Sequence, residues 1–156
     1  MKLRKIIPIL FILLSLFSFV GCTNSKENTD EVLKYSTPIV ENILESVNSL
    51  DYDSLKDKLS KEMLEMMKDK ESFISLMMPI KGKIGDYEAG SLKFVESMKK
   101  KDYISMLYEA NFSSEKEPVM ISVTFKDDDK KHKIQELYIN SPKIQELAKN
   151  NKDALK

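Results

Sequence analysis

The spacing of apolar residues changes once along this chain, and the change limits the folds that are open to it. In residues 31–78, apolar residues recur at intervals of three and four, which is the spacing of one face of an α-helix. From residue 87 onward the interval moves toward two, which is the spacing of one face of a β-strand. The turn-rich segment KGKIGD at residues 81–86 lies between them. Helices followed by a run of strands predict an α+β fold.

The first helical region is predicted over residues 31–50. Pro38 is tolerated in a first turn but not in a helix interior, so the stable helix is expected to begin near Thr37, with Thr37 as its N-cap. The stretch before it would form a separate turn. After a break, Asp51 or Asp53 is expected to cap the next helix.

The second helical region is expected to divide at Ser60, a candidate N-cap, and to end at Met78. The end is placed there because a residue before proline, here Pro79, is pushed out of the α conformation. Methionines are concentrated in this region, where they can either fill an irregular core or form an adaptable apolar groove. They are Met63, Met66, Met67, Met77 and Met78.

A set of strands joined by short polar links is predicted after the turn. The predicted strands cover residues 87–98, 103–112, 119–125 and 134–139. A phase slip between Ile134 and Leu137 indicates a bulge. Short links between consecutive strands predict an antiparallel meander, with the helices on one face of the sheet. Residues 143–156 are expected to form a short helix and a frayed tail.

Short stretches in this region carry a resemblance to a known family. They are LDYD at residues 50–53, KIGDY at 83–87, YEANF at 108–112 and PV at 118–119. Together with the order of the elements, they resemble an uncharacterised bacterial domain family that is similar to the nuclear-transport-factor-two-like and cystatin-like cone folds. The resemblance spans about residues 32–140. It implies a cone domain over residues 31–142, but the cone fold hosts enzymes, binding modules and structural proteins alike.

The N-terminus has the pattern of a secretory signal. Lys2, Arg4 and Lys5 precede an apolar run over residues 6–20. The run is shorter than the roughly 20 residues that a membrane-spanning helix needs, and no charged stop follows it. We therefore expect residues 1–21 to be a signal peptide.

Cys22 is the only cysteine of the chain and directly follows this segment. The residues FVGC at 19–22 resemble the lipobox of bacterial lipoproteins, in which the cysteine receives a diacylglyceryl group before cleavage. The resemblance implies a lipoprotein anchored on the extracytoplasmic face of the cell membrane, through acyl chains such as palmitate on Cys22. Two chains hold a protein stably at ~0.8 kcal/mol per buried CH₂. The polar residues 23–30 would be a flexible tether, and an ordinary cleavage site with a free thiol is the alternative.

Charge and residue counts exclude several classes of function. Without residues 1–21 the chain has 22 lysines and arginines against 25 acids, a net charge of −3. This balance argues against nucleic-acid binding and predicts only weak attraction to an anionic membrane surface. A lipidated Cys22 would leave no thiol for a disulfide. With a single histidine in the chain, neither a zinc site nor a cofactor is predicted.

Local motifs for catalysis or ion binding are weak. His132 lies in the charged segment DDDKKHK, and a solvated turn is the preferred interpretation over a catalytic base. A calcium loop starting at Asp127 would place His132 where a glycine is required and Tyr138 where a glutamate is required. Gly82 and Gly85 precede a strand pattern rather than the helix of a phosphate loop. No metal site is predicted.

A pocket inside the cone is the remaining candidate site. Its predicted residues are Tyr108, Met106, Phe112 and Tyr138. A neutral tyrosine can stabilise an oxyanion while a desolvated carboxylate, such as that of Glu136, acts as base. Glu109 is expected on the opposite face from Tyr108 by strand alternation.

Three functions remain open from the sequence. The preferred one is a non-enzymatic domain that binds a small apolar ligand, a peptide or another envelope protein. The alternatives are a cone-pocket enzyme that uses tyrosine and carboxylate, and a purely structural envelope accessory. An interior filled by methionine and phenylalanine side chains would argue against any function inside the cone.

Overall fold

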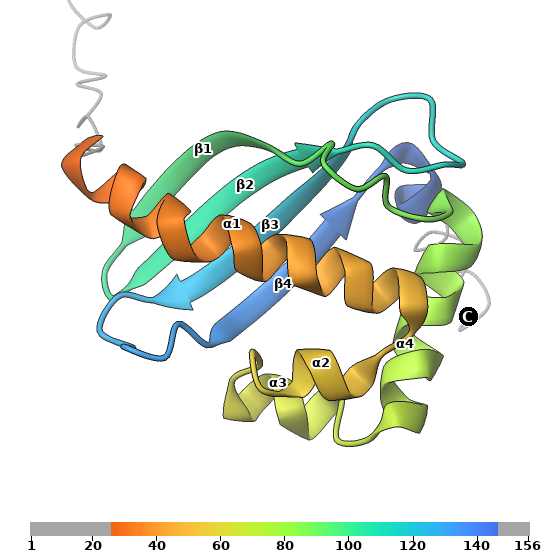
Figure 1. Ribbon diagram of the computed structural model, residues 1–156, viewed down its shortest axis with the longest axis horizontal. Helices are drawn as coiled ribbons and strands as arrows, with labels where there is room; N and C mark the ends of the chain where they lie inside the picture. Colours follow the sequence, from red (N-terminus) through yellow and green to blue (C-terminus); the bar gives the residue numbers. More distant parts are fainter. Residues whose placement is uncertain (1–25, 147–156) are drawn as a thin grey trace, which may run out of the picture.

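The computed structural model describes residues 26–146, and its fold is α+β (Figure 1). One face of a four-stranded sheet, ordered β1-β2-β3-β4 and antiparallel throughout, is covered by the long helix α1 (Lys26–Ser49). The strands are β1 (Lys93–Lys100), β2 (Tyr103–Ala110), β3 (Val119–Lys126) and β4 (Ile134–Asn140). The shorter helices are α2 (Tyr52–Lys56), α3 (Lys61–Met66) and α4 (Lys70–Ile84). The predicted class and the predicted antiparallel meander are confirmed.

Helix α1 is continuous, so the prediction that it begins at Thr37 is wrong. Pro38 lies inside the helix and removes the hydrogen bond to the carbonyl of Lys34. Both Pro38 and Lys34 are exposed, so water can reach that carbonyl. The opposite side of α1 is held by burial against the sheet, through Val32, Ile39, Val40, Ile43, Leu44 and Val47. The helix includes residues 26–30, for which a flexible tether was predicted.

The caps predicted for the next two helices are confirmed. The Asp51 carboxylate accepts hydrogen bonds from the N–H groups of Asp53 and Ser54 at the start of α2. The Ser60 hydroxyl accepts one from the N–H of Met63 at the start of α3. Each polar side chain satisfies backbone donors that a first helical turn leaves without partners.

Helix α4 continues through Pro79, so the end predicted at Met78 is wrong. The carbonyl four residues earlier belongs to Ser75, which is exposed, and the lost hydrogen bond therefore faces solvent. The helix ends instead at Gly85, whose φ of 81° is in the left-handed region that favours glycine. Its N–H donates to the carbonyl of Lys81. The predicted turn over residues 81–86 is thus mostly the last helical turn.

Strand β1 is shorter than predicted because its first residues form a turn. Tyr87 makes only an isolated bridge to Phe112, and regular pairing begins at Lys93. The Asn48 side chain of α1 fixes Tyr87 by bonding both its N–H (2.8 Å) and its carbonyl (2.9 Å). The bulge predicted in β4 is confirmed at Gln135, where the register with β3 shifts.

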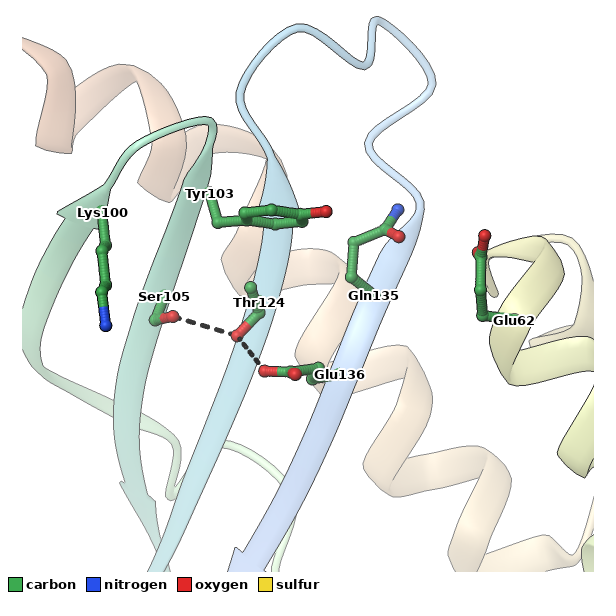
Figure 2. Close-up of a pocket in the computed structure, with 7 residues that line it drawn as sticks. All are labelled: Glu62, Lys100, Tyr103, Ser105, Thr124, Gln135 and Glu136. Carbon is green, nitrogen blue, oxygen red and sulfur yellow. Dashed lines mark hydrogen bonds between the residues drawn. The ribbon is translucent and has the colours of Figure 1, made fainter.

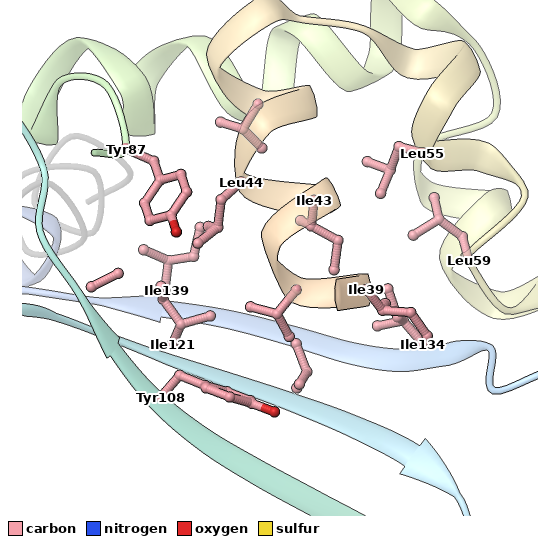
Figure 3. Packing of buried hydrophobic residues seen from close by; sticks show 14 of the residues in the cluster. Ile39, Ile43, Leu44, Leu55, Leu59, Tyr87, Tyr108, Ile121, Ile134 and Ile139 are labelled. Carbon is pink, nitrogen blue, oxygen red and sulfur yellow. The ribbon is translucent and has the colours of Figure 1, made fainter. Parts of the chain in front are cut away.

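The core lies between α1 and the inner face of the sheet (Figure 3). Side chains from α1 meet those of β2, β3 and β4, and side chains from the α2 region close one side. Those that Figure 3 labels include Ile39, Ile43, Leu44, Leu55, Leu59, Tyr108, Ile121, Ile134 and Ile139. The Tyr108 hydroxyl bonds the hydroxyls of Ser36 (2.7 Å) and Thr37 (3.3 Å), joining α1 to β2.

Candidate functional site

The structure separates the predicted pocket residues onto two faces of the sheet. Met106 and Tyr108 are 0 % exposed and Phe112 is 4 % exposed, all among the core residues. Tyr138 is 65 % exposed. It lies beside its register partner Ser122 on the outer face of the sheet, away from α1. Because neighbouring residues of a strand alternate between faces, Tyr138 points away from the core that its neighbour Ile139 enters. Tyr108 and Tyr138 therefore do not line one cavity.

The acid and base considered for catalysis are not brought together either. Glu109 lies on the outer face of β2, as predicted, and forms an ion pair of 3.9 Å with Lys93. Glu136 also lies on the outer face, in register with Thr124. The Tyr108 hydroxyl is bonded by the hydroxyls of Ser36 and Thr37 instead of facing a carboxylate. Its position indicates a structural role between α1 and the sheet.

A groove of about 560 Å³ crosses the outer face of the sheet, on the side away from α1 (Figure 2). We call it the outer groove. It is lined by Glu62, Lys100, Tyr103, Ser105, Thr124, Gln135 and Glu136. These residues come from α3 and from every strand of the sheet, so the groove exists only in the folded domain.

The floor of the outer groove is a row of hydrogen-bonded side chains. Ser105, Thr124 and Glu136 are partners across β2, β3 and β4. Directly paired residues of antiparallel strands project from the same face. The Thr124 hydroxyl donates to the Glu136 carboxylate (3.3 Å), which leaves Thr124 to accept from the Ser105 hydroxyl (3.0 Å). The register of the sheet therefore aims a chain of hydroxyl groups at one carboxylate.

The two ends of the outer groove carry opposite charge. Lys100 stands at the β1 side of the row, and Glu62 of α3 stands beyond β4 at the other side (Figure 2). The ring of Tyr103, which is 44 % exposed, adds an apolar surface between them. A ligand with an amino group and a carboxylate would match carboxylates at one side and an ammonium at the other.

Sequence reasoning missed most of this groove. Only Glu136 was among the residues considered for a site. The polar residues Ser105 and Thr124 alternate with buried ones, but the same alternation is typical of any solvated sheet face. Glu62 is brought in by α3, which is more than 70 residues away from Glu136 in sequence.

The sequence predicts a solvated turn at His132, and the structure differs. His132 is partly buried, and its ring stacks on Tyr35 of α1 with centroids 3.7 Å apart and planes 10° from parallel. Burial raises the pKa of Tyr35 to about 12, and the negative charges of Asp127 and Glu31 act in the same direction. This stack packs the β3–β4 hairpin onto α1.

The described part of the chain holds neither a metal-binding cluster nor a membrane-spanning helix. Within residues 26–146, no cluster of three or more histidine, cysteine, aspartate or glutamate side chains is arranged to hold a metal ion. That part of the chain also contains no helix with the length and apolar character needed to cross a membrane. The predicted signal peptide and Cys22 lie outside the described residues.

No protein-family model matches the chain, and no curated protein matches it. Three solved structures have a similar backbone arrangement. A loop-truncation variant of IdmH has a TM-score of 0.41 and 13 % identity, with 72 % of this chain and 96 % of that chain covered. A protein described as a SnoaL-like polyketide cyclase, from Shewanella denitrificans, has a TM-score of 0.37 and 9 % identity, with coverages of 73 % and 96 %. An NTF2-like protein of unknown function from Cytophaga hutchinsonii has a TM-score of 0.34 and 14 % identity, with coverages of 70 % and 92 %.

Proposed function

We propose that this chain is a membrane-anchored lipoprotein whose domain binds a small polar ligand or a short peptide in the outer groove, without catalysing a reaction. The observation that carries the binding proposal is the outer groove itself. It offers about 560 Å³ lined by side chains with charged and hydroxyl groups. The core side of the sheet instead presents fully buried residues such as Met106 and Tyr108 to α1.

The lining selects among the ligand classes that the sequence left open. An apolar small molecule would bury the groups of Lys100, Thr124 and Glu136 without giving them partners, which is unfavourable. A peptide segment carries amide groups for the hydroxyls and can carry a cation toward Glu62 and Glu136. A polar ligand or peptide is therefore favoured over an apolar one.

Catalysis is not favoured by the environment of the carboxylates. Acid and base catalysis by a tyrosine and a carboxylate depends on a desolvated site. Glu62 and Glu136 are both exposed, and Tyr103 is 44 % exposed. These groups are suited to recognising charge on a ligand. A purely structural role would leave the outer groove without any ligand. Measuring whether a ligand is bound therefore distinguishes a binding role from a structural one.

Native mass spectrometry of the lipidated protein, extracted from its own membrane, tests the binding proposal. We expect a bound species whose occupancy falls at least about tenfold in Glu136→Gln, since a charge-assisted contact contributes about 1.4 kcal/mol or more. Glu96→Gln is the matched control, because Glu96 is an exposed glutamate on β1 outside the groove lining. A wild-type protein that carries no ligand, or equal occupancy in both variants, would contradict a binding role for the outer groove.

The anchor is supported by the position of Cys22 in the FVGC sequence, directly after an apolar run of signal-peptide length. Cys22→Ser removes the thiol that would carry the lipid while leaving residues 26–146 unchanged. We expect the variant to move from the detergent phase to the aqueous phase in phase partitioning. Unchanged partitioning would rule out Cys22 as the anchor.

A further inference from the structure

One end of the domain brings together the start of α1 and two hairpins (Figure 1). We call the β1–β2 turn (residues 99–102) and the β3–β4 hairpin (residues 126–133) the lysine hairpins. They are joined to each other by the Lys99–Asp127 ion pair and by the backbone bond from Asp127 to Asp102 (2.8 Å). The β3–β4 hairpin is joined to α1 by the stack of His132 on Tyr35.

The lysine hairpins hold an excess of positive charge. They contain seven lysines and four aspartates, a net charge of +3, whereas the other described residues contain twelve lysines and twenty acids. Two of the aspartates are paired within the hairpins, each with one of the seven lysines: Asp127 with Lys99 and Asp128 with Lys126. Asp129 accepts from two backbone N–H groups. Asp30, Glu31 and Lys34 of α1 reduce the excess at this end to +2.

Four exposed lysines of the lysine hairpins have no ion pair in the described structure: Lys100, which also lines the outer groove, and Lys101, Lys130 and Lys131, which lie outside it. Lys101 has a φ of 54° in the turn between β1 and β2, in a region where glycine or asparagine is the unstrained choice. A charged residue occupies this strained position although a glycine would suit the turn better.

From these observations we propose that the lysine hairpins rest on an anionic bilayer surface and orient the domain on the membrane. The proposal depends on the lipid anchor proposed above. Cys22 precedes the first helical residue, Lys26, by four residues, which span at most about 14 Å when fully extended. The short link keeps this end of the domain, and not the β2–β3 end, next to the membrane.

The uneven charge explains why the net charge of the chain is a poor guide here. The mature chain as a whole carries −3, which predicts weak attraction to anionic lipid. Salt screens the electrostatic interaction of each charge beyond about 8 Å at physiological ionic strength. The bilayer surface is therefore attracted or repelled mainly by the charged groups nearest to it. With the lysine hairpins toward the bilayer, the acidic remainder of the domain faces away from it.

Amine footprinting of the full mature lipoprotein in vesicles tests the proposal. The protein is placed in vesicles of phosphatidylglycerol and phosphatidylcholine, or of phosphatidylcholine alone, and acetylated with a water-soluble reagent. Labelling of Lys101, Lys130 and Lys131 is compared with that of Lys83 and Lys116 near the β2–β3 link, which are exposed internal references. We expect at least about fivefold less labelling of the hairpin lysines in the anionic vesicles, from about 1 kcal/mol per lysine near the surface.

Each outcome of this experiment decides the proposal. The protection should be absent on phosphatidylcholine and lost in about 1 M salt, where the Debye length is about 3 Å. Equal labelling at both ends of the domain in anionic vesicles would overturn the orientation while leaving the anchor intact. Protection that is the same in both vesicles and in high salt would also overturn it. A protein that does not stay with either vesicle would refute the anchor itself, and the orientation with it.

Discussion

Removing the hydroxyl of Tyr108 should destabilise the domain by about 1.5 kcal/mol. Tyr108 and Ser36 are both 0 % exposed, and their hydroxyls are 2.7 Å apart. In Tyr108→Phe the ring still packs, but the buried Ser36 hydroxyl loses its partner on β2, and the longer contact to Thr37 (3.3 Å) is lost as well. A lost hydrogen bond costs about 1 kcal/mol net and an unsatisfied buried group about 1–3 kcal/mol. Ser36 can bond a carbonyl of its own helix, which keeps the cost near the lower end.

Tyr87→Phe is the matched control. Tyr87 is 4 % exposed, and its hydroxyl has no hydrogen-bond partner among residues 26–146. Its removal should leave the free energy of unfolding unchanged or raise it by about 1 kcal/mol, because a buried hydroxyl without a partner is itself unfavourable. Urea unfolding followed by circular dichroism measures both, and an m-value of about 1–3 kcal/mol/M converts the Tyr108 effect into a midpoint shift of about 0.5–1.5 M. Wild-type stability of Tyr108→Phe, or an equal loss in Tyr87→Phe, would refute the structural role of Tyr108.

Further substitutions in α4, at Gly85 and at Tyr35 test the helix end and the packing of the β3–β4 hairpin. Gly82→Ala should raise the free energy of unfolding by about 0.5–1 kcal/mol, because Gly82 lies in α4 and a Cβ there meets nothing within 4 Å. Gly85→Ala should lower it by about 1–3 kcal/mol, because φ is 81° and a Cβ would lie 2.8 Å from the Ser114 nitrogen; thermal unfolding that showed the same sign for both would contradict this. Stability should fall between pH 10 and pH 12, because tyrosine ionises at about 10 in the unfolded chain while the pKa of Tyr35 is about 12 in the fold. Tyr35→Phe should remove that part of the loss in urea titrations at each pH, and an unchanged pH dependence would count against the burial of Tyr35.

The fold class was predictable because burial repeats along the sequence. The inner face of β3 (Val119, Ile121, Val123 and Phe125) is 0 % exposed, as strict alternation predicts. The bulge in β4 was also visible, as a phase slip in the same pattern. Such periodic patterns depend only on which residues face the core, and they are independent of the conformation of the loops.

The helix boundaries were not fully predictable because tertiary packing overrides local rules. Pro38 and Pro79 each remove one helical hydrogen bond, and local reasoning therefore started or ended a helix there. In the structure both prolines lie on exposed sides of their helices, where water can bond the freed carbonyl. Burial of the opposite side keeps each helix continuous. The sequence alone does not show which side of a helix the proline occupies until the packing partner is known.

The residues predicted to line one pocket lie on two faces of the sheet, and the reason is similar. The alternation in β2 predicts that Tyr108 faces the interior, and it does, but its hydroxyl bonds the Ser36 hydroxyl of α1 within the packed core. The outer groove depends on register, which aligns Ser105 with Thr124 and Glu136, and on α3, which supplies Glu62. Neither the register nor the placement of α3 can be read from apolar spacing. Polar residues on an exposed face have many explanations before the strands are aligned.

Two proposals depend on the lipidation of Cys22. They are that the outer groove lies close to a membrane and that the lysine hairpins face the bilayer. The most direct test is the intact mass of the mature protein purified from its membrane, with fragmentation of its first residues. We predict a chain that begins at Cys22, lacks residues 1–21 and carries a diacylglyceryl group on the Cys22 sulfur. A chain that keeps residues 1–21, or that begins at Cys22 with an unmodified thiol, would contradict the lipoprotein account.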